Sequence, residues 1–542
     1  MTVTQPDPGA TATGATADRG HGSSSPRLPD SLTDAVKARL CAYVPGSGEA
    51  AAVTTNAPFS GRAIVELPQC SPTDVLVAAD KARTAQRAWA AKPIADRARV
   101  FLRLHDLVLD HREQLMDVIQ TENGKARRDA FLEVGDIANT CRYYARTAQA
   151  ALAPKRRTGL IPGLTHVTEV RHPKGIVTII SPWNYPLSLG AGDTIPALLA
   201  GNAVVQKADN QTALTALYAL DLARRAGLPP DLWQIVLGRG SAIGDTLLDI
   251  ADSVMFTGST ASGRHIAAAA GERLLDCSLE LGGKNAMIVL DDANLDRTVE
   301  GAVRACFSSS GQLCISIERL YVADSIYDRF VPRFVEATAS MTIGASYDFD
   351  MTMGSLTSAE QLDATSRHVE QAVEAGATVL TGGRARPDLG PFFFEPTVLT
   401  DVTTRMDCFA EETFGPLVSI YRFGSEQEAI DAANDTDYGL NASVWSSSSR
   451  GAEVARRLRS GTVNVNEAFA AAWGSIDAPM GGMGVSGVGR RHGAVGIQKY
   501  TEVQTIAEQR LMNLAPPKFL GDSGFADVMT TALRVMKAAR WR

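Results

Sequence analysis

Short apolar runs alternate with helix-like stretches between residues 175 and 263, and this alternation limits the fold more than any other feature. Four runs have the length and composition of buried strands: 175–180, 203–207, 234–237 and 254–257. A helical pattern over 212–226 stops at Gly227, with Pro229 just beyond. Strands and helices that alternate in this way form a doubly wound parallel sheet, which binds a nucleotide at its strand ends. We therefore expect an α/β fold with a nucleotide site.

The composition fits a globular protein of two or three domains. The 542 residues exceed a single ordinary core, and 45% are hydrophobic. A net charge of −7 without a long basic run excludes the electrostatic pattern of a nucleic-acid binder. Seven scattered cysteines favour a reducing cytoplasm, and the eight histidines show no clustering that predicts a metal site. No stretch of about twenty apolar residues is long enough for a membrane span.

Glu280 and Cys314 are the residues whose chemistry stands out. Glu280 opens a Glu-Leu-Gly-Gly-Lys-Asn run, and Cys314 closes a Gly-Gln-Leu-Cys run. A cysteine attacks as its thiolate, and a nearby glutamate can deprotonate the thiol or a water. The adjacent glycines allow backbone and ligand to approach closely. On residue types alone, a small buried cysteine and a strand that ends in a turn stay open as alternatives.

Six motifs in a fixed order carry a resemblance to a known family. Besides those two runs they are Ser181-Pro182-Trp183-Asn184-Tyr185-Pro186, Gly201-Asn202-Ala203-Val204-Val205-Gln206-Lys207, Phe256-Thr257-Gly258-Ser259-Thr260 and Glu411-Glu412-Thr413-Phe414-Gly415-Pro416. Over roughly residues 40 to 510 they resemble the motifs of the aldehyde dehydrogenase superfamily. The resemblance implies a doubly wound Rossmann-type cofactor domain, an α/β catalytic domain and a β oligomerisation arm.

The resemblance also implies how the chain is divided. The NAD(P)-binding domain would comprise 31–153 and 173–282, the arm 154–172 and 495–510, and the catalytic domain 283–494. In the arm, 159–173 would pair with the segment 500–505 and build a homodimer or homotetramer. An ordinary hairpin has the same strand chemistry and is the alternative.

Both ends of the chain extend beyond these domains. Residues 1–30 are rich in Ala, Thr, Gly, Ser and Pro, so we expect a disordered lead. Residues 511–542 read as an amphipathic tail whose apolar face comprises Phe525, Val528, Met529, Ala532, Leu533 and Met536. Packing on the body or on a second subunit is the favoured prediction. Docking on a membrane surface and a free helix are the alternatives.

Three catalytic roles follow from the resemblance. Cys314 would attack an aldehyde, and Asn184 with the Cys314 backbone amide would donate to the oxyanion. Hydride loss to a nicotinamide would leave a thioester, and Glu280 would activate the water that hydrolyses it to a free acid. A cofactor-independent thioesterase or esterase that uses the same residues stays open, as does a non-catalytic scaffold.

Cofactor contacts are implied at several strand ends and one loop. The matching positions are Trp183, Asn184, Lys207, Ala208, Asp209, Asn210, Gly258, Ser259, Leu281 and Glu412. A helical segment follows Ser259, and its free amides favour a phosphate. Many family members have a glutamate at the place of Asn210, which repels a 2′-phosphate. Because Asn210 is neutral, we expect NADP to be weakly favoured, while Asp209 keeps NAD as an alternative.

The sequence as a whole resembles actinobacterial enzymes labelled succinate-semialdehyde dehydrogenase. This resemblance makes succinate semialdehyde the leading candidate substrate. Two arginines that hold the substrate carboxylate in well-defined members are replaced by Ser308 and Gly192. An anion without such partners is costly to bury. Small residues over 187–192, with Phe469 and Trp473 as expected pocket residues, favour a bulkier aliphatic or aromatic aldehyde as the alternative.

Overall fold

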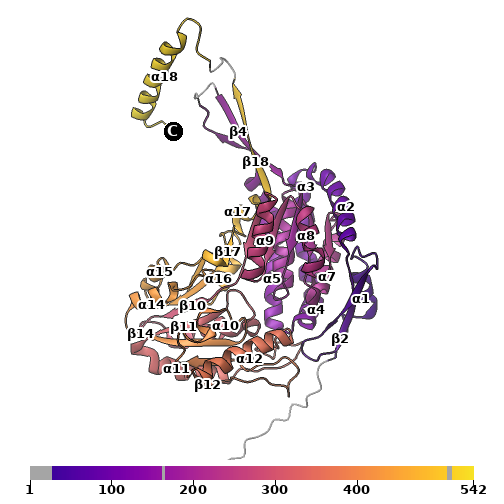
Figure 1. Cartoon of the computed structure of the whole chain (residues 1–542), viewed down its shortest axis with the longest axis vertical. Coiled ribbons are helices and arrows are strands. Elements are labelled where there is room, and N and C mark those ends of the chain that lie inside the picture. The colour runs from indigo at the N-terminus through magenta and orange to yellow at the C-terminus, as the bar shows by residue number, and fades with distance from the viewer. Residues whose placement is uncertain (1–26, 161–164, 510–514, 542) are drawn as a thin grey trace, which may run out of the picture.

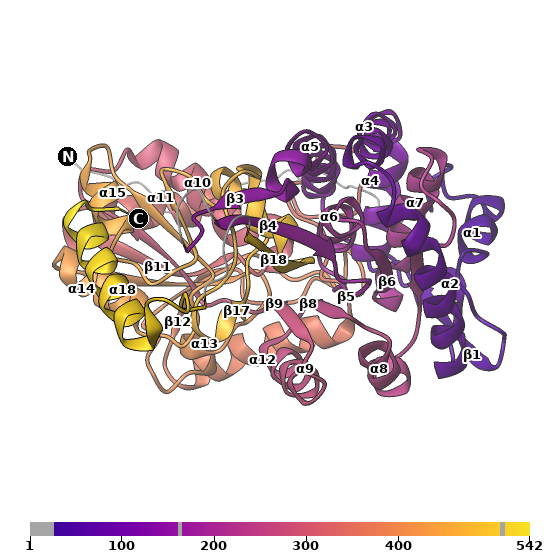
Figure 2. The same ribbon diagram turned by 90° about the horizontal axis from the view of Figure 1, so that it is seen from above.

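The computed structural model describes residues 27–160, 165–509 and 515–541. Two α/β halves lie side by side, and a narrow β arm projects from them (Figures 1 and 2). Most of the predicted lead, residues 1–26, lies outside the described residues. Across the described part of the chain, no helix combines the length and the apolarity that a bilayer span requires.

The first half contains a six-stranded sheet in the order β17-β9-β8-β5-β6-β7. Its strands are β5 (Ile176–Ile180), β6 (Ala203–Lys207), β7 (Trp233–Val236), β8 (Ser253–Thr257), β9 (Asp276–Glu280) and β17 (Gly487–Val488). Neighbours from β9 to β7 pair in parallel, and only β17 runs antiparallel to its neighbour. The four predicted strands are confirmed to within one residue at each end, and so is the doubly wound α/β fold.

Helices cover both faces of this sheet. They are α1 (Asp34–Cys41), α2 (Pro72–Ala90), α3 (Ile94–Asp110), α4 (Arg112–Asn123), α5 (Arg127–Leu152), α6 (Pro186–Leu199), η1 (Asn210–Thr212), α7 (Ala213–Arg225), α8 (Gly240–Asp249), α9 (Thr260–Glu272) and α17 (Gly493–Gln498). A hairpin of β1 (Ala50–Asn56) and β2 (Ala63–Gln69) flanks them. The predicted stop signal is confirmed, because α7 ends before Gly227, which has a φ of 98°.

The second half contains a seven-stranded sheet in the order β12-β13-β14-β11-β10-β15-β16. Its strands are β10 (Asn285–Val289), β11 (Ile317–Ala323), β12 (Thr378–Thr381), β13 (Thr397–Thr400), β14 (Leu417–Phe423), β15 (Asn441–Trp445) and β16 (Thr462–Val465). Its helices are α10 (Leu295–Phe307), η2 (Ser308–Gly311), α11 (Asp324–Ala339), α12 (Ala359–Glu374), α13 (Asp407–Ala410), α14 (Glu426–Asn434), α15 (Arg450–Ala455), α16 (Ala470–Gly474) and η3 (Gly484–Ser486). Each half has its own large apolar core.

The chain crosses between the halves twice near the predicted site. The four residues between β9 and β10 carry it from the first sheet to the second. Strand β17 then returns to pair with β9, although it lies in the range 283–494 predicted for the catalytic domain. Glu280 is therefore flanked within one sheet by Thr257 of β8 and Gly487 of β17.

The arm is a three-stranded antiparallel sheet of β3 (Lys155–Arg157), β4 (Thr165–Pro173) and β18 (Thr501–Gln509), in the order β18-β4-β3. Nine register pairs join β18 to β4, from Thr501↔Pro173 to Gln509↔Thr165. This confirms the predicted pairing of the two segments, whereas their role in assembly stays a prediction. Residues 161–164 of the predicted arm lie outside the described part.

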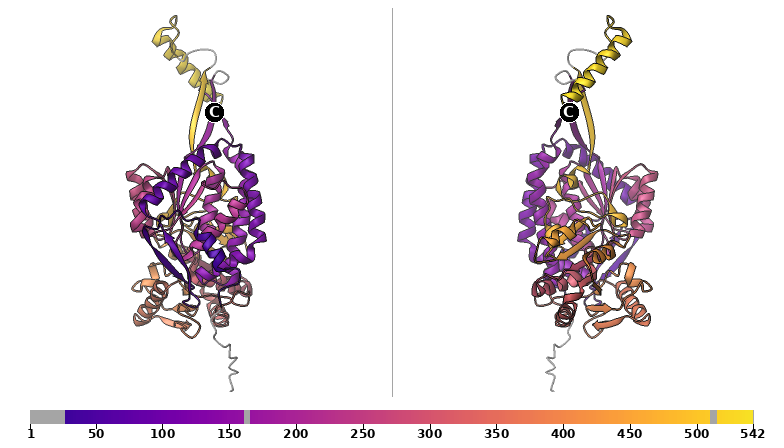
Figure 3. Two further views of the ribbon diagram at one scale, coloured as in Figure 1. Left: turned by 90° about the vertical axis from the view of Figure 1, so that its right-hand side faces the viewer. Right: turned by 90° about the vertical axis from the view of Figure 1, so that its left-hand side faces the viewer.

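The predicted tail contains one helix, α18 (Gly521–Ala538), and none of its residues is buried. It stands beside the outer end of the arm, away from both halves of the molecule (Figure 3). The body of the chain therefore does not cover its apolar face, so packing on the chain's own body is not what the structure shows. Residues 510–514 and 542 lie outside the described part.

Candidate active site

Cys314 lies in a tight loop between η2 and β11. Ser309 and Ser310 have left-handed backbone angles, with φ of 52° and 57°. Gly311 follows with a φ of 71°, and a Cβ there would come within 2.0 Å of the Gly415 carbonyl oxygen. Such strained conformations persist only where their surroundings hold them, and they occur often at functional sites.

Buried hydrogen bonds hold this loop in place. The backbone N–H of Ser309 donates to Asp129 at 2.9 Å, and the Ser310 hydroxyl donates to the Gly354 carbonyl at 3.1 Å. The Gln312 side chain donates to the Ser309 carbonyl and accepts from the Thr357 N–H. Contacts from α5 and from the segment 354–357 therefore fix the backbone just before Cys314.

The surroundings of the Cys314 thiol favour its protonated form. Burial raises its pKa to about 12, the carboxylates of Glu412 and Glu280 add to the rise, and the Arg491 guanidinium lowers it. Thiolate formation therefore needs a base at the moment of attack.

Asn184 follows β5 and lies next to the cysteine loop. Its side-chain amide donates to the Gln312 carbonyl at 3.0 Å. Its own carbonyl accepts from Lys125 Nζ at 2.6 Å and from Asn123 at 3.3 Å. Lys125 is fully buried and pairs with Glu133 at 2.7 Å, which in turn accepts from the first N–H groups of α6. The Asn184 backbone is thus held by a buried ion pair.

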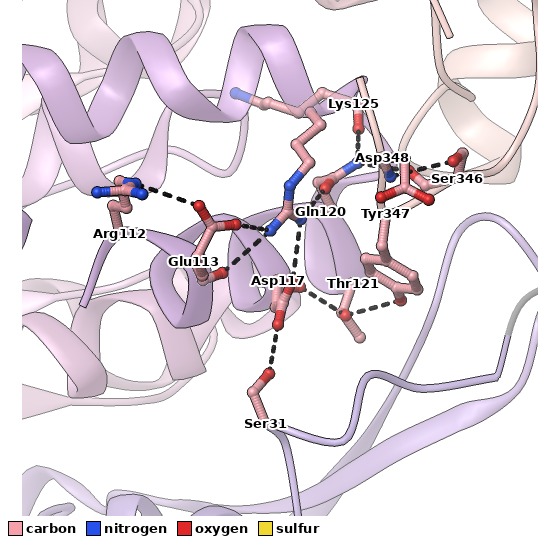
Figure 4. A network of polar contacts seen from close by, with 11 residues as sticks. Ser31, Arg112, Glu113, Asp117, Gln120, Thr121, Lys125, Ser346, Tyr347 and Asp348 are labelled. Carbon is pink, nitrogen blue, oxygen red and sulfur yellow. Dashed lines mark hydrogen bonds and ion pairs between the residues drawn. The ribbon is translucent and has the colours of Figure 1, made fainter. Parts of the chain in front are cut away.

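The turn that carries Lys125 is anchored to the second half of the molecule (Figure 4). The Gln120 amide donates to the Lys125 carbonyl and to the Ser346 carbonyl, at 3.3 and 2.8 Å. Thr121 and Tyr347 share a hydrogen bond at 2.9 Å. These contacts join the end of α4 to the segment after α11, so the loop of the amide donor is positioned from both halves.

Glu280 is the last residue of β9 and is buried, and its Oε1 has no hydrogen-bond partner. Burial raises the pKa of its carboxyl group to about 7, while the cations of Arg491 and Lys499 lower it. A carboxylate that titrates near neutral pH suits a general base.

One cavity of about 220 Å³ brings the three predicted catalytic residues together with most of the predicted cofactor contacts. Its lining includes Cys314, Glu280, Asn184, Trp183, Gly258, Ser259, Leu281 and Glu412. Residues from the loop after β5, from β8 and β9, from the cysteine loop and from the segment after α13 therefore meet at the boundary between the halves.

Four predicted cofactor contacts do not line this cavity. Lys207 ends the neighbouring strand β6, where it is the register partner of Ile180, and Ala208, Asp209 and Asn210 come directly after it. Asp209 caps η1 through the Gln211 N–H. Asn210 donates to Gln69 at 3.0 Å. They extend the same edge of the sheet beyond the cavity.

The cavity residues fit a nicotinamide dinucleotide. Ser259 caps α9 by accepting from the Ser262 N–H, so the positive end of a 13-residue helix faces this edge. A Cβ on Gly258 would meet the Phe256 ring at 2.6 Å. Glu412 accepts from the Gly283 N–H at 2.9 Å, and burial followed by the Glu318 charge raises its pKa to about 8. Amide donors and a carboxylate acceptor match a pyrophosphate and a ribose hydroxyl.

A second cavity of about 210 Å³ lies on the other side of the cysteine loop, between Leu313 and Ile315 on one wall and α5 on another. Tyr185, Phe469 and Trp473 contribute aromatic surface, and the exposed Phe131 and Leu132 lie among its lining. Among the described residues that line it, Asp136 has the one carboxyl group, and burial raises its pKa to about 7. Ser308 and Gly192 are not among its lining residues, and each lines a neighbouring hollow instead.

Several charged residues at the site escaped sequence reasoning. Asp129, Glu133 and Asp136 follow one another along one face of α5 and are buried. Arg491 pairs with Asp193 of α6 at 3.0 Å. A helix face rich in acidic residues is usually exposed to solvent. The sequence does contain a signal that these acids are buried. Few basic residues lie three or four positions away from them, so few could pair with them on an exposed helix face.

Two mostly parallel sheets that meet at a cysteine, with a helix N-terminus suited to a phosphate beside it, are typical of a two-domain α/β enzyme that binds a dinucleotide. The sequence model of the Aldehyde dehydrogenase family matches residues 43–506. The chain therefore belongs to the aldehyde dehydrogenase family, and it is an enzyme that oxidises aldehydes.

Relatives are similar over most of their length. A Mycobacterium ulcerans protein with the provisional name succinate-semialdehyde dehydrogenase (NADP+) 2 is 54% identical over 460 residues, or 85% of this chain and 89% of that protein. The mitochondrial succinate-semialdehyde dehydrogenase of Arabidopsis thaliana is 36% identical, covering 84% of this chain and 85% of that protein. The NAD+ complex of an aldehyde dehydrogenase from Bacillus cereus has a TM-score of 0.80 and 32% identity, covering 84% of this chain and 93% of that chain.

Proposed function

We propose that this chain oxidises its aldehyde to a free carboxylic acid through a thioester on Cys314, with NADP or NAD as hydride acceptor. The observation that carries the proposal is the cavity that Cys314, Glu280 and Asn184 share with the cofactor-type residues. A cofactor-independent esterase would have no need for the acceptors and donors at α9 and Glu412. The names of the relatives support NADP, and the solved relative supports NAD.

The residues would act in sequence. The Cys314 thiol releases its proton to solvent as Sγ bonds to the carbonyl carbon, and the Asn184 amide together with the Cys314 N–H donates to the oxyanion. A nicotinamide held by Trp183, Ser259 and Glu412 would supply the acceptor for the hydride that leaves the carbon. Glu280 then takes a proton from water, whose oxygen attacks the thioester, and the S–C bond breaks to release acid and thiol. Because Glu280 lines the cavity and can activate water there, hydrolysis of the thioester is favoured over transfer of the acyl group to another acceptor.

A stopped-flow experiment with Glu280→Gln tests this function. The parent should form reduced cofactor continuously at 340 nm. The variant should give a burst of one equivalent per site followed by at least about a hundredfold slower turnover, since only deacylation lacks its base. Cys314→Ala should give neither burst nor turnover. Continuous turnover by either variant at the parent rate would contradict the proposal.

Succinate semialdehyde is the first candidate substrate, on the names of the relatives. The second candidate is an uncharged aliphatic or aromatic aldehyde. It is favoured by the apolar second cavity, where a substrate carboxylate would meet Asp136 and no cationic side chain among the lining residues.

A kcat/KM comparison of succinate semialdehyde, hexanal and benzaldehyde at one pH decides between the candidates. If the cavity sets specificity, hexanal or benzaldehyde should exceed succinate semialdehyde by at least about tenfold, because one uncompensated charge costs more than 1.4 kcal/mol. Asp136→Asn should lower the ratio of kcat/KM for the uncharged aldehyde to kcat/KM for succinate semialdehyde. A succinate semialdehyde value far above the others would assign the relatives' substrate to this chain.

We also infer assembly through the arm and a cytoplasmic location. The exposed apolar residues Val503 and Ile506 on β18 support a surface that a second subunit covers. A homodimer or homotetramer accounts for this surface. For α18 a second subunit is favoured over a membrane surface. The seven cysteines, all unpaired, support a reducing compartment.

A further inference from the structure

Arg491 lies next to the proposed base and is 6% exposed. It follows β17, and its backbone exchanges two hydrogen bonds with Met480, at 2.7 and 2.9 Å. Its guanidinium Nη2 donates to Asp193 at 3.0 Å and to the Thr257 hydroxyl at 3.1 Å. Thr257 is the register partner of Glu280 in the β8·β9 pair. The guanidinium therefore reaches the side chain of the residue that pairs with Glu280 across the two strands.

Three charged groups surround Glu280 in this buried region. Asp193 of α6 is 3% exposed and lies between the two cations, with Lys499 Nζ at 3.6 Å. The Tyr500 hydroxyl donates to the same carboxylate at 3.4 Å. Because the cations of Arg491 and Lys499 face the single carboxylate of Asp193, these three groups together carry one net positive charge.

Other titratable groups also lie near Glu280, and the charge of Arg490 lowers its pKa as well. Arg490 donates to the carbonyls of Gly482 and Gly489 at the rim. Cys314 faces Glu280 across the cofactor cavity. Asp136 lies beyond Arg491, in a small polar hollow that both residues line. None of them offsets the charge of Arg491 as Asp193 does.

Glu280 and Arg491 each keep one polar atom without a hydrogen-bond partner, Glu280 Oε1 and Arg491 Nε, and both atoms are buried. A buried carboxylate without a full set of hydrogen bonds is unfavourable unless nearby charge compensates it. The ionised form of Glu280 therefore depends on the field of its neighbours more than on direct hydrogen bonds.

We propose that Arg491 and Asp193 are positioning residues that set the charge of Glu280 with opposite signs. The Arg491 guanidinium keeps the carboxyl group of Glu280 ionised. Asp193 holds the guanidinium in place, and its own negative charge opposes the ionisation of Glu280. This proposal rests on the proposed function, in which Glu280 activates the hydrolytic water. The directions of the pKa shifts agree with it, since Arg491 and Lys499 lower the pKa of Glu280 and Asp193 raises it.

The pH dependence of deacylation tests the proposal. The rate that follows the burst is measured from pH 5.5 to 9 for the parent, Arg491→Met and Asp193→Asn. A base with a pKa near 7 is inactive when protonated, so the rate rises with pH through that value. Arg491→Met should move the rise to higher pH by about one unit or more, and Asp193→Asn should move it to lower pH.

Matched variants separate this role from a structural one. Lys499→Met removes a cation of the same sign and should move the rise upward. Arg491→Lys keeps the charge and should leave the midpoint within about half a unit. Arg490→Gln, at the rim, should shift it less than Arg491→Met. If Arg491→Met fails to fold, Lys499→Met and Asp193→Asn still carry the opposite signs.

Two outcomes overturn the proposal. One is a lower rate at all pH values with an unmoved midpoint, which assigns Arg491 and Asp193 to structure alone. The other is a shift in the same direction for Arg491→Met and Asp193→Asn. Glu280→Gln distinguishes these failures from failure of the proposed function. If that variant keeps the parent rate and pH profile, Glu280 is not the base. If it loses turnover while the others do not move the midpoint, only the present inference fails.

Discussion

Asn184 illustrates how one side chain at the site is prepared by residues far away in the chain. Its carbonyl is held by Lys125 at 2.6 Å, and its amide points at the Gln312 backbone, two residues before Cys314. Preorganised donors stabilise a developing oxyanion because they need no rearrangement during the reaction. A change at this amide should therefore affect the chemical step and leave substrate binding almost unchanged.

We expect Asn184→Ala to lower kcat by about a hundredfold to a thousandfold, or roughly 3 kcal/mol, with a KM change below about threefold. Steady-state kinetics with the best aldehyde of the panel measures both. Asn434→Ala, which removes an amide that bonds the Arg457 carbonyl on the surface, is the matched control and should keep the parent kcat. A loss in KM alone would assign Asn184 to binding.

At the same scale, sequence reasoning found the reacting groups but not their supports. Cys314, Glu280 and Asn184 stand in motifs that the family resemblance makes readable. Lys125 and Arg491 stand in no such motif, and their charges predict an exposed position. Only the fold shows that Lys125 is fully buried and holds the loop of the amide donor.

At the scale of elements, the sequence predicted those helices and strands that contain enough apolar residues in a regular pattern. Strands β5, β6, β7 and β8 are buried along nearly their whole length, so continuous apolar runs identify them. Strand β17 has two residues, Gly487 and Val488, and no periodicity can reveal it. Its place is set by close backbone approach, since a Cβ on Gly487 would lie 2.2 Å from the Leu279 carbonyl oxygen.

Helix η2 shows the same limit for a different reason. Its left-handed turn uses Ser309 and Ser310, where glycine or asparagine would have been the usual signal. The conformation is stabilised by Asp129, from a helix about 180 positions earlier in the chain. Periodicity also predicted helix α18, because its pattern is local, but the position of α18 depends on contacts that no local pattern contains.

At the scale of the whole molecule, the arm and tail are the parts that one chain leaves uncovered. Val503 and Ile506 of β18 are 53% and 49% exposed, and Leu533 and Val535 of α18 are 58% and 60% exposed. A lone helix of this length is only marginally stable in water, and its stability in proteins comes from packing of the apolar face. The arm and α18 adjoin one another away from the catalytic cavity (Figures 1 and 3).

We therefore expect deletion of residues 521–542 to lower the mass of the assembly, or its stability to dilution, while kcat per site stays within about twofold. Light scattering coupled to gel filtration measures the mass, and the aldehyde assay measures kcat. The double variant Val528→Asp with Leu533→Asp should reproduce the loss, because it places charge on the apolar face. The double variant Arg534→Ala with Lys537→Ala should keep the parent mass.

Sedimentation with anionic lipid vesicles distinguishes a membrane surface from a second subunit as the partner of α18, because the two kinds of contact depend on different residues. A membrane surface attracts the basic residues and would release the Arg534→Ala, Lys537→Ala variant at moderate salt. A second subunit buries the apolar residues and is insensitive to that change. If neither mass nor vesicle binding changes on deletion of 521–542, α18 has no partner of either kind, and the exposed face of the arm alone must account for assembly.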